Sequence, residues 1–234
     1  MKIAIMGAMP EEITPLLERM DSYEKVDYAQ NSYYLARYHE LELVIAYSKI
    51  GKVFAALTAS TMIEKFGARK LLFSGVAGAI NPALKIGDLI TATKLCQHDL
   101  DITAFGHPYG YVPEGKVYIE SDAALRGIAQ GVAKDVGITL KEGIIATGDQ
   151  FVADPDRKAW IAEIFDADAL EMEGASVAVV CDSLNVPFFV LRAISDSADM
   201  DAGFDFDTFL EESAKVSADF IIAMLDRLLH DRDQ

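Results

Sequence analysis

The stretch Leu170–Asp199 constrains the fold of this chain more than any other segment. It begins with Leu-Glu-Met-Glu, continues through small and apolar residues as far as Asn185 and Pro187, and ends in the apolar run that leads to Asp196. This order predicts a strand, a helix and a second strand, the repeating unit of α/β proteins. Open α/β sheets bind ligands at the edge where such strands end. We therefore expect a ligand site at the end of this unit.

Two acids stand near the strand ends of this otherwise apolar unit, Glu173 and Asp196. A buried carboxylate costs free energy unless it is paired or used. One alternative is structural, with one acid capping a helix and the other forming a turn. The other is a pair of functional carboxylates. Arg192 and Ser195 stand beside Asp196, and this concentration of polar residues favours the functional pair.

The rest of the chain alternates between strand and helix patterns, with one hairpin. Strands are expected at Lys2–Ala8, Tyr33–Tyr38, Leu41–Ser48, Lys70–Phe73, Asp88–Leu95 and Leu140–Ala146. Helices are expected from Pro10, over 51–66 and 121–135, and at Asp154–Phe165 and Phe206–Leu229. This order predicts one α/β domain over residues 1–234, with a mixed central sheet.

Charge and composition exclude several classes of partner. Acidic residues outnumber basic ones by 37 to 21, giving a formal net charge of −16. Nucleic acids and anionic membranes bind basic surfaces, so neither is expected as a partner. The two cysteines lie in unrelated contexts without a CxxC motif, which predicts a reducing, cytoplasmic compartment. The four histidines lack metal-binding spacing, so no metal is expected.

Four further features follow expected strands. Glu12 either stabilises the positive end of the next helix or faces a site. Phe151 either stacks on a planar ligand or closes the core. The small residues of Ser74–Ala79 predict a tight turn that is either structural or phosphate-binding, although the GxGxxG and P-loop lysine patterns are absent. The long aromatic loop Gln97–Pro113 is typical of functional or partner-contacting loops.

Six motifs carry a resemblance that covers nearly the whole chain. They are Ile5–Met9 with Glu11-Glu12, Ser74–Gly78, Thr103–Gly106, Gly148–Phe151, Glu171–Glu173 and Arg192–Asp196. Each is weakly specific alone, but in this order and spacing the set resembles bacterial 5′-methylthioadenosine/S-adenosylhomocysteine nucleosidases. Two segments, Tyr47–Val53 and Gln97–Asp99, are most similar to the campylobacterial branch, whose members also hydrolyse 6-amino-6-deoxyfutalosine in menaquinone synthesis.

The resemblance implies a fold, an activity and five catalytic residues. The fold would be nucleoside phosphorylase-like, with three layers, and the protein a homodimer that hydrolyses the N-glycosidic bond to adenine without a cofactor. Asp196 would protonate adenine N7, held by Ser195. Glu12 would orient the attacking water with Arg192 nearby, and Glu173 would accept the ribose hydroxyls. Glu171, the other acid of Glu-Met-Glu, is expected to be structural.

The resemblance also implies the substrate contacts. Phe151 would stack on the purine, the Val152 backbone would bind the adenine edge, and Met172 would pack on the sugar. Val76 stands where many relatives have a serine near the water site. Three apolar residues would line the 5′ pocket: Met9, Ile50 and Phe206.

The aromatic loop would serve the neighbouring subunit. The resemblance implies that Ile102, Phe105 and Pro113 are lent to the partner's site, which would explain the unusual aromatic loop.

Three other functions compete with a nucleosidase. A nucleoside phosphorylase on the same fold needs basic groups to hold phosphate, and Glu12 would repel phosphate at the nucleophile position. A nucleoside-binding sensor needs no acid and base pair such as Asp196 and Glu12. A dinucleotide-binding enzyme would need the glycine fingerprint that is missing.

Overall fold

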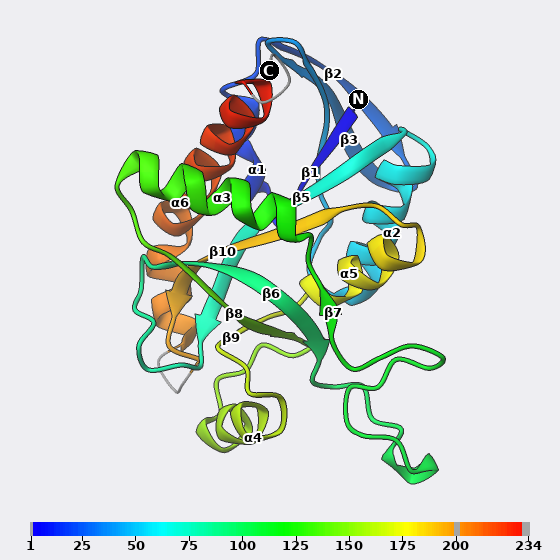
Figure 1. The fold of residues 1–234 in the computed structure, drawn as a ribbon, viewed down its shortest axis with the longest axis vertical. Helices are drawn as coiled ribbons and strands as arrows, with labels where there is room; N and C mark the ends of the chain where they lie inside the picture. Colours follow the sequence, from blue (N-terminus) through cyan, green and yellow to red (C-terminus); the bar gives the residue numbers. More distant parts are fainter. Residues whose placement is uncertain (1, 199–201, 231–234) are drawn as a thin grey trace.

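The computed structural model describes residues 2–198 and 202–230, so Asp199, at the end of the predicted strand–helix–strand unit, lies outside it. Within these residues, ten strands form one mixed sheet with helices packed around it (Figure 1). The strands are β1 Lys2–Gly7, β2 Ser22–Tyr28, β3 Asn31–Tyr38, β4 Leu41–Tyr47, β5 Ala68–Ala79, β6 Leu89–Gln97, β7 Ile119–Glu120, β8 Leu140–Thr147, β9 Ala169–Glu171 and β10 Phe188–Asp196. The helices are α1 Pro10–Leu17, α2 Lys52–Glu64, the 3-10 turn Thr103–Phe105, α3 Ala123–Val136, α4 Pro155–Phe165, α5 Gly174–Ser183 and α6 Ala202–His230.

The sheet closes on itself around β5. Its order is β10-β6-β8-β9-β5-β1-β4-β3-β2, and β10 pairs with β5 as well as with β6. Five strands, β5, β10, β6, β8 and β9, therefore form a ring, while β1 to β4 extend from β5 as an open sheet. The predicted hairpin is confirmed as the antiparallel pair β3 and β4.

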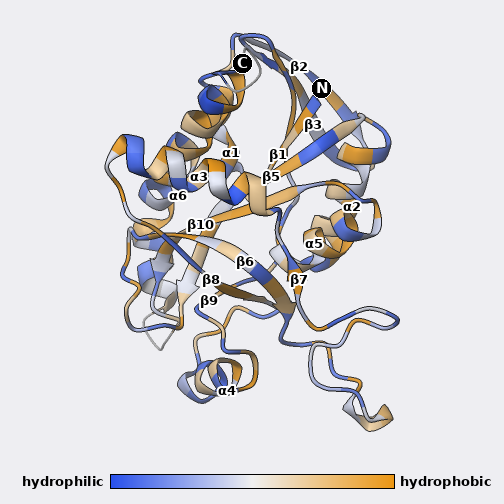
Figure 2. Cartoon of the chain, in the orientation of Figure 1, coloured by the Kyte–Doolittle hydropathy of each residue, from blue (hydrophilic) through white to orange (hydrophobic). Residues whose placement is uncertain are grey.

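Helices cover both faces, which confirms the three-layer α/β fold. On one face α2 and α5 pack against the sheet through residues such as Met62 and Val177. On the other face α1, α3 and α6 supply Ile13, Leu125 and Ile221 to a second core. Figure 2 shows hydrophobic residues along β10 and alternating hydrophobic and hydrophilic residues along α6. That alternation is typical of an amphipathic helix that packs one face against the core.

The predicted tight turn at Ser74–Ala79 is wrong, because these residues continue strand β5. Because these residues are small, acidic side chains can approach the strand backbone closely. A Cβ added to Gly75 would lie 2.8 Å from Glu12 Oε1, and one added to Gly78 would lie 2.6 Å from Asp196 Oδ1. Both distances are shorter than Cβ atoms tolerate. The glycines therefore make room for two carboxylates against the strand.

The predicted strand–helix–strand unit exists, but its two strands are not parallel. Strand β9 runs antiparallel to β5, whereas β10 runs parallel to it. Both nevertheless border the same residue, since Leu170 and Asp196 are each paired with Gly78. The two ends of the unit meet there, as expected, through closure of the sheet rather than through a parallel crossover.

The edge strand β2 (Ser22–Tyr28) was not predicted from the sequence. Six of its seven residues are exposed, so it lacks the apolar pattern that identified the other strands. Elsewhere, Cys96 and Cys181 are buried and free. None of the helices in the described ranges is long and apolar enough to cross a lipid bilayer.

A buried ion pair holds the closing strands together. Arg192 Nη2 on β10 lies 2.7 Å from Glu171 Oε2 on β9, and the two side chains are 2% and 3% exposed. Glu171 also accepts a hydrogen bond from the Thr147 hydroxyl on β8. Arg192 Nη1 donates to the Phe73 carbonyl on β5. The pair thus links four strands of the ring, and Glu171 also lines the cavity described below.

Replacing Glu171 by Gln should destabilise the fold strongly. The substitution keeps the shape but leaves the Arg192 charge buried without a counter-ion, which typically costs roughly 3–5 kcal/mol. Urea unfolding at one fixed protein concentration would measure the free energy of unfolding. The control, Asp182→Asn, removes the exposed pair with Lys116 and should cost less than about 1 kcal/mol. Equal losses in the two variants would contradict the role of the pair.

Candidate active site

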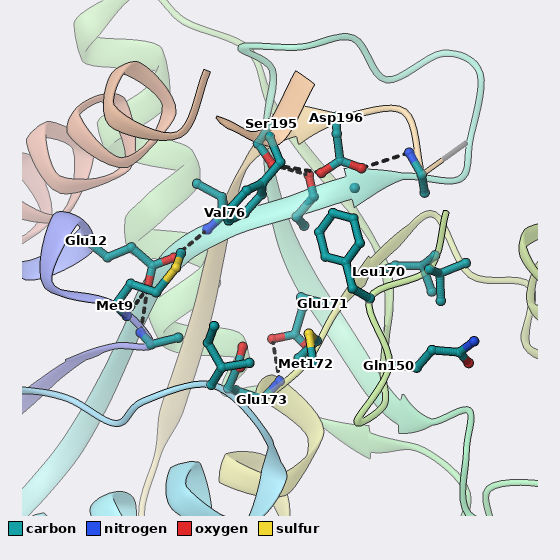
Figure 3. A pocket seen from close by; sticks show the side chains of 18 residues that line it. Met9, Glu12, Val76, Gln150, Leu170, Glu171, Met172, Glu173, Ser195 and Asp196 are labelled. Carbon is teal, nitrogen blue, oxygen red and sulfur yellow. Dashed lines mark hydrogen bonds between the residues drawn. The ribbon is translucent and has the colours of Figure 1, made fainter. Parts of the chain in front are cut away.

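A cavity of about 270 Å³ lies where β5, β9 and β10 meet (Figure 3). Its walls come from the start of α1, the end of β5, residues 150–152, the β9–α5 junction, the end of β10 and the start of α6. Most of the residues expected to form the site line it: Met9, Glu12, Ile50, Val76, Phe151, Val152, Met172, Glu173, Ser195, Asp196 and Phe206. The fold therefore brings together segments from both ends of the chain.

Glu12 is buried at one end of the cavity. Its Oε2 accepts hydrogen bonds from the Ala8 and Met9 N–H groups, and its Oε1 accepts one from the Val76 N–H at 3.2 Å. Burial raises its pKa, while the Arg192 charge and these three donors oppose the rise. Both predicted alternatives are correct, because Glu12 caps the start of α1 and also faces the cavity.

Asp196 lies at the other end, where β10 finishes. Its Oδ2 accepts a hydrogen bond from the Ser195 hydroxyl at 2.9 Å, and its Oδ1 accepts one from the Ala198 N–H at 2.8 Å. These two contacts, drawn in Figure 3, fix the plane of the carboxyl group. Strand β5 approaches Glu12 at Gly75 and Asp196 at Gly78. At about 3.3 Å per residue, the two carboxyl groups are separated by roughly 10 Å along the strand.

Glu173 forms the third acidic group. It precedes α5, is buried, and its Oε1 accepts a hydrogen bond from the Gly51 N–H at 2.8 Å. Burial, followed by the negative charge of Glu171, raises the pKa of Glu173 to about 8. Both causes favour the protonated form of the side chain. Gly51 was not predicted as a site residue, although a glycine directly before an expected helix was a sequence signal for it. In the structure it is the N-cap of α2, with φ +102°.

Arg192 lies behind the cavity and is not among its lining residues. Its guanidinium group is held by Glu171 and lies 4.1 Å from the centre of the Phe73 ring. Its charge still opposes the raised pKa values of Glu12 and Glu173. Arg192 can thus tune the two carboxyl groups electrostatically while remaining engaged by another acid.

Two aromatic side chains, Phe151 and Phe206, form part of the cavity wall. Phe151 is 46% exposed and meets Phe206 edge to face, with 5.6 Å between ring centres. This exposure is incompatible with the alternative that Phe151 closes the core. Its position in the cavity wall leaves it available for stacking on a planar ligand, and Val152 next to it is buried.

The residues expected to serve a partner do not line the cavity of their own protomer. Ile102, Phe105 and Pro113 belong to the loop between β6 and β7, which extends away from the sheet (Figure 1). Phe105 is 80% exposed. In the described part of the chain, no group of three or more His, Cys, Asp or Glu residues is arranged to hold a metal.

Comparisons with known proteins agree with this geometry. The family model described as the phosphorylase superfamily matches residues 2–228. An aminodeoxyfutalosine nucleosidase of Campylobacter jejuni is 61% identical, with 97% of this chain and 100% of the relative covered. A 5′-methylthioadenosine/S-adenosylhomocysteine nucleosidase of Bacillus licheniformis is 39% identical, with 97% and 100% covered.

Solved structures show the same fold. A Helicobacter pylori nucleosidase mutant with 5′-methylthioadenosine in its active site matches with a TM-score of 0.95 at 50% identity, covering 96% of this chain and 98% of that one. A crystal structure of the Campylobacter jejuni nucleosidase matches with a TM-score of 0.93 at 61% identity, covering 97% and 99%. The chain therefore belongs to the phosphorylase superfamily and, within it, to the bacterial methylthioadenosine/S-adenosylhomocysteine and aminodeoxyfutalosine nucleosidases, which makes it an N-glycosyl hydrolase.

Proposed function

We propose that this protein hydrolyses the N-glycosidic bond of adenine nucleosides and releases adenine and the ribose derivative. The substrates would be methylthioadenosine, S-adenosylhomocysteine, 5′-deoxyadenosine and 6-amino-6-deoxyfutalosine. The observation that carries the proposal is the placement of two buried carboxyl groups, Glu12 and Asp196, at two points of β5 on the wall of one cavity. The substrates named for the relatives support this choice. Free, buried cysteines are in keeping with a reducing, cytoplasmic compartment.

Asp196 would act on the leaving group. Adenine is a poor leaving group as an anion, whereas protonation at N7 lets it depart neutral. A positioned acid therefore acts mainly in the transition state. The hydrogen bonds from Ser195 and the Ala198 N–H hold the carboxyl group in one orientation. Phe151 would hold the purine plane against this acid, and the Val152 backbone would bind the adenine edge.

Glu173 and Glu12 would act on the sugar and on the water. Departure of the base leaves an oxocarbenium-like sugar, which a carboxylate at the ribose hydroxyls stabilises electrostatically. Hydroxyl donors at Glu173 favour its ionised form. Glu12 and Asp196 approach β5 at points three residues apart, Gly75 and Gly78. Glu12 would hold water on the face of the sugar opposite the base, as in inverting glycosidases. Val76 supports Glu12 through its N–H, a contact that requires no side-chain hydroxyl.

The choice among nucleosides would depend on the 5′ pocket. Met9, Ile50 and Phe206 line the cavity and would contact the 5′ substituent, the part in which the four substrates differ. Ile50 is 56% exposed, so this end of the cavity is open in a single protomer. Measuring kcat/KM for the four nucleosides side by side would rank them.

We also propose a homodimer in which Ile102, Phe105 and Pro113 of one protomer complete the site of the other. Exposed apolar residues near the open end of the cavity support a protein contact there, since Val53 is 76% and Phe54 44% exposed on α2. The partner's loop would cover the 5′ pocket and exclude water from it.

Adenine release in phosphate-free buffer tests the reaction itself. The buried carboxyl group of Glu12 would repel phosphate, and Arg192 is already engaged by Glu171. We expect methylthioadenosine to be cleaved at the same rate with and without phosphate. Dependence on phosphate with formation of ribose 1-phosphate would show a phosphorolytic reaction, and adenine binding without turnover would show a binding protein.

Replacing Asp196 by Asn should remove the general acid while preserving the size of the side chain. We expect kcat for methylthioadenosine to fall by ~10²-fold or more, the contribution typical of acid catalysis. Steady-state kinetics would measure the loss, and Asp182→Asn on the exposed face of α5 is the matched control. Near-normal turnover by Asp196→Asn would exclude the acid role.

The raised pKa of Glu173 predicts a pH-dependent stability of the ligand-free protein. Between the ordinary value of 4.5 and about 8, folded Glu173 binds more protons than unfolded Glu173. The free energy of unfolding should therefore decrease as pH rises through this range, and Glu12 contributes with the same sign. The Tm of Glu173→Gln should decline less steeply than that of wild type, whereas Glu11→Gln, an exposed control, should follow wild type. Identical slopes for all three would refute the prediction.

Mixed dimers test the shared site. Phe105→Ala should raise KM about tenfold, because an apolar contact worth about 1.5 kcal/mol or more is lost. Co-expression with Asp196→Asn produces heterodimers in which one site has both an intact Asp196 and an intact Phe105. At substrate concentrations below KM, activity should exceed the mean of the two separate variants. Activity equal to that mean would rule out sharing.

A further inference from the structure

Two carboxyl groups from distant segments meet the N-terminus of α2. The first N–H groups of a helix have no partner within the helix, and Gly51, the N-cap residue before α2, has no side chain to cap them. Asp149 Oδ1 accepts a hydrogen bond from the Lys52 N–H at 2.7 Å, and Glu173 Oε1 accepts one from the Gly51 N–H at 2.8 Å. The start of α2 thereby connects the segment after β8 with the β9–α5 junction.

A third acid, Asp99, fastens this connection from the end of β6. Its Oδ2 accepts a hydrogen bond from the Asp149 N–H at 2.8 Å, and its Oδ1 lies 2.7 Å from Lys52 Nζ. Lys52 Nζ also donates to Gln97 Oε1 at 3.1 Å. The side chains of Lys52 and Asp99 are 18% and 24% exposed, so solvent screens this pair only partly. We call Lys52, Asp99 and Asp149 the Asp99 network.

The charge of Asp99 is secured by its contacts. Burial alone would raise its pKa, but hydrogen bonds from Lys52 and the Asp149 N–H outweigh burial and place the pKa below the ordinary value. Asp99 is therefore ionised at neutral pH, and its hydrogen bonds are charge-assisted and strong.

The residue before Asp149 is fixed as well. A Cβ added to Gly148 would overlap the ring of His98, so the backbone packs directly on that ring. Arg157 Nη2 donates to the His98 carbonyl at 3.0 Å and lies 3.1 Å from the ring Nδ1. Burial lowers the pKa of His98 to about 4, so the ring is neutral and Nδ1 can accept from Arg157.

These contacts connect two walls of the cavity that carry partly exposed side chains. Phe151 and Ile50 are 46% and 56% exposed. Phe151 lies two residues after Asp149, and Ile50 lies two residues before Lys52. We propose that Asp99 is a positioning residue that, through Asp149 and Lys52, fixes the purine-binding segment 149–152 relative to Glu173 and the start of α2. The role in substrate binding rests on the proposed nucleosidase function.

The variant Asp99→Asn tests this inference, because an amide has one acceptor oxygen for the two contacts. We expect KM for methylthioadenosine and the Kd of adenine, measured by calorimetry, each to rise about tenfold, with kcat within about twofold of wild type. This split follows because Asp196, Glu12 and Glu173 keep their own partners while the purine wall loosens. Rescue by Asp99→Glu should be partial.

Lys52→Met provides a second variant and leaves the backbone cap intact. We expect the same split with a smaller rise in KM, and the double variant with Asp99→Asn should be less than additive because the two residues are in contact. Lys116→Met, which removes the exposed pair with Asp182, is the matched control and should leave KM and Kd unchanged. If Asp99→Asn does not fold, Lys52→Met decides by the same readouts.

Several results would overturn the inference. Unchanged KM and adenine Kd in Asp99→Asn, with or without a lower Tm, would make Asp99 purely structural. A fall in kcat at constant KM would place its effect on catalysis rather than on purine binding. If wild type binds adenine but releases none from methylthioadenosine, the proposed function fails, while the adenine Kd of the variants still tests the Asp99 network.

Discussion

Two carboxyl groups lie directly against the backbone of one strand, and the rest of the site depends on this approach. Glu12 reaches Gly75, and Asp196 reaches Gly78, so closely that a Cβ at either position would force the carboxyl group to shift. Strand β5 can lack side chains at these positions because neighbouring strands hold its backbone by hydrogen bonds. These strands are β10 on one side and β1, followed by β9, on the other. Regular pairing thus replaces side-chain packing in fixing the strand, and the spacing of two glycines sets the interval between the acids.

Burying several acids around one cavity requires compensation. Glu171 forms the ion pair with Arg192. Glu12 and Glu173 therefore accept hydrogen bonds from backbone N–H groups, and their pKa values are raised. A buried pair is costly to break but contributes little to net stability against an apolar alternative. Its value here is electrostatic, because Arg192 limits the pKa values of the two cavity acids without entering the cavity. A substrate with ribose hydroxyls would add hydrogen-bond donors at Glu173 to the Gly51 N–H already present.

Two walls of the cavity come from parts of the chain that are distant in sequence, the segment just before α2 and residues 150–152. The start of α2 and the segment after β8 meet through Asp149, and Asp99 fastens both. Charge-assisted hydrogen bonds are directional, so they fix the relative position of exposed residues such as Ile50 and Phe151 more firmly than apolar contact at the protein surface. The same region faces the open end of the site, where the proposed partner loop would complete it.

The sequence alone determined the order of elements, the acids and the family, because periodicity and short motifs are local properties. It placed most strands and helices correctly, and most residues expected in the site line the cavity. It misjudged Ser74–Ala79, since small residues are compatible with both a turn and a crowded strand. It missed the exposed strand β2 and the antiparallel direction of the three-residue strand β9, which have almost no local signature. Only the tertiary structure decided the pairing of Arg192 with Glu171 and of Asp99 with Asp149, because contacts between residues distant in sequence depend on how the whole sheet closes.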